Sequence, residues 1–173
     1  MATSHDPEMI KASKRDVVLV LIIFLVSAAG MTSVFTRDRV LAWIVIIISD
    51  LYLSIVLLLA ALLSDDESFL NRHSWMRGFL PRRRTAGLLV VMLLFLAIIS
   101  GFAGLYVGAE VFASVKTPLD ALYISSFTLA LTDYSPKPGY GQLVVLAQIV
   151  SSVLLVVALF PLIISRISTF KHL

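Results

Sequence analysis

The chain has 173 residues, of which 59% are hydrophobic and 14% are charged, and its mean hydropathy is +0.97. Water-soluble domains average about 45–50% apolar and about 25% charged residues, so this composition excludes a soluble enzyme. The formal net charge is only +3 and the basic residues gather between apolar runs, which argues against a nucleic-acid-binding surface. Because cysteine is absent, disulfides, thiolate metal sites and a catalytic thiol are excluded as well.

Four long apolar stretches follow one another, at residues 16–36, 40–63, 87–109 and 141–167. About 20 helical residues, at about 1.5 Å each, cover a hydrocarbon core of roughly 30 Å. The first stretch is too long for a signal peptide, and the second follows it almost at once. The sequence therefore predicts an all-α membrane protein with four transmembrane helices, the first two forming a hairpin over 16–63.

The basic residues beside these spans predict the orientation, because Lys and Arg accumulate on the cytoplasmic side. We expect a plasma-membrane protein with both termini cytoplasmic, as tails at 1–15 and 168–173. The linker 64–86 would then be cytosolic and basic, and its mixed residues at 68–80 predict an interfacial helix. Ten basic residues fall on the cytoplasmic side, Lys11, Lys14, Arg15, Arg72, Arg77, Arg82, Arg83, Arg84, Arg166 and Lys171, and four on the other, Arg37, Arg39, Lys116 and Lys137.

A short helix is predicted between the third and fourth spans. Thr117 is a favourable N-cap, Pro118 suits the first helical position, and Asp120 places an acid in the first turn. A helix over 118–131 would be roughly 20 Å long, which is too short to cross the bilayer. It must enter and turn back, and such a backbone is tolerated only where protein buries it or water reaches it. The turn at 132–138, which contains the predicted short filter 132–136, therefore predicts a pore or a vestibule.

Polar residues follow this helix where its C-terminal carbonyls would point. The aggregate charge of about −0.5 at a helix C-terminus favours a cation there. Carboxylate, hydroxyl and carbonyl oxygens suit hard cations, so we expect permeant sodium or potassium, with calcium as a further candidate. The predicted ion filter consists of Leu131, Thr132, Asp133, Tyr134 and Ser135.

The same region carries a familiar order of residues: Asp120-Ala121-Leu122-Tyr123 opens the short helix, Thr128-Leu129 follows, and Pro138 and Gly141 precede the last span. This order resembles the pore module of tetrameric potassium channels, in which DALYFSFVTLTTVGYGD is commonly followed by PLG and an inner helix. The resemblance covers residues 87–167. It implies an outer helix, the pore helix 118–131, a filter and an inner helix 141–167 in a four-fold symmetric homotetramer.

The potassium filter sequence TVGYG of that family is absent. With DALY kept in register, Leu131 to Ser135 occupy the filter positions and only Tyr134 matches. Alternatively, the sequence DYSP at 133–136 resembles the residues directly after the filter in some calcium-gated prokaryotic members, and four residues after Thr132 are missing. Both registers lack the two filter glycines, and losing four extended residues shortens a filter by roughly 12 Å. We therefore expect a short and weakly selective filter.

Asp133 is the candidate metal-ion residue of this filter. In a tetramer it would form a ring of four carboxylates, which attracts cations and can hold a divalent cation through water. The alternative for Asp133 is a turn or capping residue. Tyr134 either packs behind the turn or contacts the ion.

The last span carries the candidate gate. Pro161 removes one intrahelical hydrogen bond and should kink the helix. A ring of Phe160 side chains could close the inner pore by excluding water, and ordinary helix packing is the alternative. Gln148 and Ser151 either line a cavity or bond a neighbouring helix. The predicted lining and gate residues are Gln148, Ser152, Val156, Phe160, Pro161 and Ile164.

Two further features lie inside the spans. Gly104 and Gly108 form a small-xxx-small pair, which predicts close helix packing. Asp50 stands near the middle of the second span, where an acid is costly unless it is paired, protonated or wet. Its candidate hydroxyl partners are Ser27, Thr32 and Ser33.

Together these features predict a homotetrameric cation channel of the potassium-channel superfamily, with a short, acidic, weakly selective filter. One alternative is a non-conducting channel-like scaffold or accessory subunit that kept the fold and lost the filter. Another is a small proton-linked transporter that uses Asp50. No nucleophile–base pair, phosphate loop or metal motif appears in the sequence. We therefore expect no catalysis, no cofactor beyond the permeant cations, and no partner besides lipid, other copies of the chain and a gating partner that no motif identifies.

Overall fold

The computed structural model describes the backbone of residues 7–65, 84–128 and 135–167, and the side chains of 14–59, 85–127 and 135–157. The described residues form five helices and no strand: α1 (Pro7–Thr36), α2 (Arg39–Asp65), α4 (Arg84–Gly108), α5 (Pro118–Thr128) and α6 (Tyr140–Ile167). Within them, four segments are long and apolar enough to cross a membrane: Lys14–Thr36, Arg39–Leu59, Thr85–Gly108 and Tyr140–Val157. The predicted all-α membrane protein with four spans is confirmed.

Helix α1 begins earlier in the chain than the predicted first span. Helix α1 begins at Pro7, inside the stretch 1–15 that was predicted as a tail. Hydrophobic patterning marks only the part of a helix that lies in the hydrocarbon core, whereas the helix itself extends as far as its backbone hydrogen bonds continue. The predicted interfacial helix at 68–80 and the tail at 168–173 lie outside the described residues.

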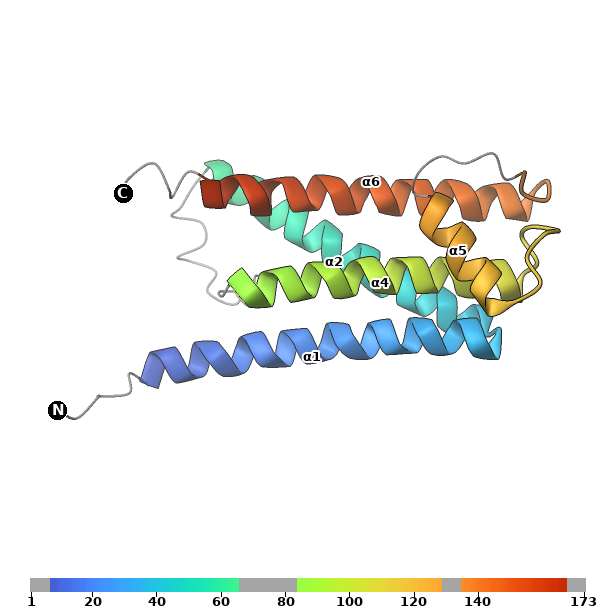
Figure 1. Cartoon of the computed structure of the whole chain (residues 1–173). Helices are drawn as coiled ribbons and strands as arrows, with labels where there is room; N and C mark the ends of the chain where they lie inside the picture. Colours follow the sequence, from blue (N-terminus) through green and yellow to red (C-terminus); the bar gives the residue numbers. More distant parts are fainter. Residues whose placement is uncertain (1–6, 66–83, 129–134, 168–173) are drawn as a thin grey trace.

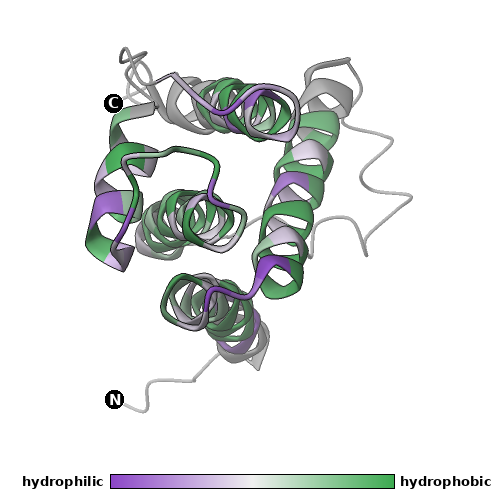
Figure 2. Cartoon of the chain, turned by 90° about the vertical axis from the view of Figure 1, so that its right-hand side faces the viewer, coloured by the Kyte–Doolittle hydropathy of each residue, from purple (hydrophilic) through white to green (hydrophobic). Residues whose placement is uncertain are grey.

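Helix α4 is the centre of the bundle. Figure 2 shows it end-on, surrounded by α1, α2, α5 and α6, and all four pack against it. Within α4, 61% of the span is buried, compared with 28–39% in the other three spans. The other three spans therefore leave many apolar side chains exposed, and lipid or another protein copy must cover them.

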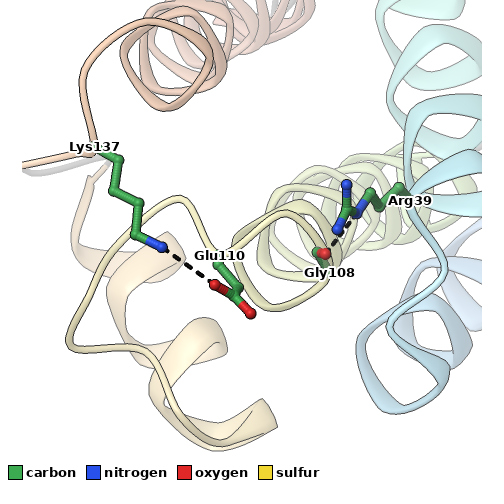
Figure 3. Close-up of polar contacts among 4 residues, drawn as sticks. All are labelled: Arg39, Gly108, Glu110 and Lys137. Carbon is green, nitrogen blue, oxygen red and sulfur yellow. Dashed lines mark hydrogen bonds and ion pairs between the residues drawn. The ribbon is translucent and has the colours of Figure 1, made fainter.

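The connections place several helix ends together. Helices α1 and α4 run in one direction and α2 and α6 in the other, so that α1 ends where α2, α5 and α6 begin (Figure 1). We call this the turn end of the bundle. Helix α4 also finishes there, at Gly108, whose carbonyl accepts a hydrogen bond of 2.5 Å from Arg39 Nε (Figure 3). A basic group at a helix C-terminus satisfies a carbonyl that the helix leaves free.

Two similar turns stop α1 and α4. Arg37, directly after α1, and Glu110, two residues after the end of α4, adopt left-handed φ angles of 56° and 50°. The next N–H in each case donates back across five residues, from Asp38 to Ser33 at 3.2 Å and from Val111 to Tyr106 at 3.2 Å. This is the Schellman pattern, which satisfies carbonyls that would otherwise be free.

Small residues let α1, α2 and α4 approach closely. A Cβ placed on Gly104 would overlap Ser33 Oγ of α1 and lie 3.1 Å from Ala42 Cβ of α2. One placed on Gly108 would lie 2.8 Å from the carbonyl oxygen of Arg37. The predicted close packing at this glycine pair is confirmed.

Candidate functional site

The start of α5 follows from local capping chemistry. The N–H of Asp120 donates to Thr117 Oγ1 at 3.1 Å, and the N–H of Thr117 donates to Asp120 Oδ2 at 2.9 Å. This reciprocal pair is a capping box, so the predicted helix start at Thr117 and Pro118 is confirmed. Hydrogen bonds from the Thr117 side chain and backbone lower the pKa of the Asp120 carboxyl.

After α5 the chain comes back to the turn end. The N–H of Lys137 donates to the carbonyl oxygen of Val111 at 2.8 Å, and Lys137 Nζ forms an ion pair of 3.2 Å with Glu110 Oε2 (Figure 3). Gly139 then takes a φ of +81°, which favours glycine, and α6 begins at Tyr140. The connection before α5 and the connection before α6 therefore lie side by side.

A buried polar network joins α4, α5 and α6. Gln148 of α6 has no exposed surface, and its Nε2 donates to the carbonyl oxygen and to Oγ of Ser125, at 2.7 and 3.1 Å. Its Oε1 accepts a hydrogen bond from the Tyr106 hydroxyl of α4. Ser125 in turn donates to the carbonyl oxygen of Ile99 at 2.8 Å. Every polar atom of the Gln148 amide is thus engaged by a neighbouring helix, which is the helix-bonding alternative considered for this residue.

A second polar contact joins α2 to α6, one turn further along. Ser151 Oγ lies 2.7 Å from Asp50 Oδ2 and 3.0 Å from the carbonyl oxygen of Ala147. Asp50 Oδ1 is buried and has no hydrogen-bond partner among the described residues. A hydroxyl does meet Asp50, but it comes from α6. The three candidates in α1 bond backbone carbonyls instead: Ser27 to Ile23 and Leu93, Thr32 to Ala28, and Ser33 to Gly30.

The predicted pore residues fall into three groups. Ser135 is exposed, Val156 is 60% exposed, and Ser152 is half-buried with its hydroxyl on the Gln148 carbonyl at 2.7 Å. The backbone of α6 is helical through Pro161, but the side chains of Phe160, Pro161 and Ile164 lie outside the described residues, so the gate stays a prediction. The same holds for the filter positions Leu131, Thr132, Asp133 and Tyr134, of which neither backbone nor side chain is described.

The sequence reasoning missed Tyr106 and Ser125 as members of the polar network. Both are polar side chains inside apolar helices, and both are fully buried. That combination in a membrane helix is itself a signal, because a buried polar group needs a partner on another helix. Among the described residues, no group of three or more Asp, Glu or His side chains stands close enough to hold a metal ion.

A separate pocket opens at the other end of the bundle, between α1 and α4. Its volume is about 490 Å³, and its position near the start of both helices separates it from the polar network and from α5. The lining is apolar except for Asp16 and Thr85, with Val17, Val20, Leu21, Phe24, Ala86, Leu89 and Leu93 forming the rest.

Comparison of the chain with protein-family models, with curated proteins and with solved structures finds no match. The resemblance to the potassium-channel pore module therefore stays a prediction from the residues that carry it.

Proposed function

We propose that the chain is the subunit of a cation channel in which the segment between α5 and α6 forms the ion path. The observation that carries this proposal is that α5 leaves the turn end and that the chain is back at the turn end where α6 begins. The hydrogen bond from Lys137 to Val111 supports a return to the side from which α5 departs.

The depth that α5 reaches supports a re-entrant helix. Ser125, near its end, bonds the carbonyl of Ile99, nine residues before α4 stops at Gly108. Nine helical residues correspond to roughly 14 Å, about half of a hydrocarbon core of roughly 30 Å. A helix that stops at half depth leaves backbone groups that lipid cannot satisfy, so water or protein must meet the chain there.

The charge pattern of this segment favours cations. The C-terminal carbonyls of α5 would aim into the membrane, and Asp133 follows a few residues later. Four copies around an axis would give an acidic, weakly selective filter for sodium, potassium and calcium. Other copies of the chain could pack against the solvent-exposed apolar side chains of α5 and α6. These are Leu119, Tyr123, Phe127, Leu143, Leu146, Val150 and Val153. The excess of Lys and Arg beside one side of the spans supports a proposed orientation with both termini in the cytoplasm, and the proposed location is the plasma membrane.

Cation flux into liposomes that contain the purified protein tests this proposal. Wild-type protein should pass potassium, sodium and calcium, and Asp133→Asn should change the flux and weaken calcium permeation most, because it removes the acidic ring. Native mass spectrometry of the same sample should report tetramers. Absence of flux from verified tetramers would overturn the channel and favour the non-conducting scaffold.

A further inference from the structure

The distances around the Ser151 hydroxyl indicate which residue supplies the proton in its contact with Asp50. Ser151 Oγ lies within hydrogen-bond distance of two acceptors, Asp50 Oδ2 at 2.7 Å and the Ala147 carbonyl oxygen at 3.0 Å. A serine hydroxyl carries one proton and can fully serve only one of them. Serines inside helices commonly donate to the carbonyl four residues earlier. If Ser151 does so, the shorter contact needs a proton from the carboxyl group of Asp50.

The other carboxyl oxygen leads to the same assignment. Asp50 Oδ1 is buried and accepts no hydrogen bond from any described residue. In an ionised carboxylate both oxygens share the charge, and leaving one of them buried without a donor is expensive. In a carboxylic acid protonated on Oδ2, by contrast, Oδ1 is an uncharged carbonyl oxygen, and its desolvation costs less.

No counter-charge stands at this depth among the described side chains. Helix α2 packs against α1, α4 and α6, and the described side chains of those spans place no Lys, Arg or His near their middle. Asp50 makes no ion pair within the part of the chain that the structure describes. The remaining ionisable side chains of the four spans are charged groups at span ends and tyrosines: Lys14, Arg15, Asp16, Arg39, Tyr52, Tyr106 and Tyr140.

We propose that Asp50 is a proton-binding site inside the membrane. The proton resides on Oδ2 and is donated to Ser151 Oγ, and Ser151 donates its own proton to the Ala147 carbonyl. This neutral relay holds α2 against α6. Loss of the proton leaves a carboxylate with one buried oxygen and at most one donor, which favours separation of the two helices and entry of water.

The site is positioned to influence the rest of the chain. Gln148 lies one turn before Ser151 on α6 and holds α5 through Ser125. A shift of α6 at Ser151 would therefore reach the helix that precedes the proposed filter. This consequence for ion flow rests on the proposed function, whereas the proton site itself does not.

Infrared difference spectroscopy of the full-length protein in liposomes at neutral pH tests the site without any need for conduction. Wild type minus Asp50→Asn should show the C=O stretch of a protonated carboxyl group. Ser151→Ala should shift that band to higher frequency, because the acid loses its acceptor. Ser49→Ala is the matched control, since Ser49 is a buried serine of α2 whose hydroxyl bonds the Val45 carbonyl of its own helix and, among the described residues, no other group, and it should leave the band unchanged.

A carboxylate stretch in place of the protonated band would overturn the proposal, as would a band that Ser151→Ala does not move. Flux at acidic and alkaline pH tests the coupling separately. Wild-type flux should change between the two, and Asp50→Asn, which is permanently neutral, should lose that dependence. If the protonated carboxyl band is present but the protein passes no cations, the proton site stands and the proposed channel function is refuted. If the band is present and the cation flux does not depend on pH, only the proposed coupling between Asp50 and ion flow is refuted.

Discussion

Replacing Gln148 with leucine should destabilise the assembly of α4, α5 and α6. The substitution removes three interhelical hydrogen bonds, two to Ser125 and one from Tyr106, and Gln148 is completely buried. Interhelical hydrogen bonds in membrane proteins average about 0.6 kcal/mol each, so their loss amounts to about 2 kcal/mol. Because leucine is close to glutamine in size, the substitution should change the packing contribution to the free energy of unfolding only slightly.

Equilibrium unfolding in mixed detergent measures this loss. The control is Gln142→Leu, the same change at an exposed position of the same helix, where the side chain accepts a long hydrogen bond of 3.4 Å from the Gly139 N–H, so it should cost little. A double-mutant cycle with Tyr106→Phe should return a coupling of about 0.6 kcal/mol, with about 1.7 as the upper limit for one bond. Equal stabilities of Gln148→Leu and Gln142→Leu, together with zero coupling, would refute the network.

Three further predictions concern the fold. Gly104→Leu should cost at least about 1–3 kcal/mol of stability in the same unfolding assay, because no space exists for its side chain, whereas Met92→Leu at a 68% exposed position of α4 should behave as wild type. Asp120→Asn should remove an acid sensitivity at the start of α5: hydrogen bonds from Thr117 lower the carboxyl pKa, so the stabilisation is complete above the unfolded-state pKa and disappears as pH falls through the folded one. The protection factors of the amides in the first turn of α5, which compare each exchange rate with that of an unstructured peptide at the same pH, should therefore fall on acidification in wild type only, and identical pH profiles would contradict this. Asp38→Ala should cost about 1 kcal/mol by removing the N-cap of α2, and Asp38→Asn should recover most of it; an Asp38→Ala variant as stable as wild type would show that the cap contributes nothing.

Features governed by nearby residues could be predicted from the sequence. The four spans follow from the length of apolar chain that lipid requires, and the start of α5 follows from Thr117, Pro118 and Asp120. The close approach at Gly104 also follows from spacing alone, because glycines four residues apart share one helix face.

Features governed by helix rotation could not be predicted. Asp50 and Ser151 are 101 residues apart, and their meeting depends on which faces α2 and α6 turn toward each other. An apolar pattern that is hydrophobic on every side gives no such direction, so a hydroxyl of α1 was an equally reasonable partner. The pairing of Tyr106 with Gln148 could not be predicted for the same reason, because it depends on which faces α4 and α6 turn toward each other.

The most direct test of the account places a single thiol in the proposed ion path. The chain has no cysteine, so a membrane-impermeant cationic thiol reagent would react only where one is introduced. In liposomes that contain Asp133→Cys, the reagent should stop cation flux, whereas Met92→Cys, on the exposed face of α4, should conduct as before. Unchanged flux in Asp133→Cys after labelling is verified by mass spectrometry would show that ions do not pass this segment.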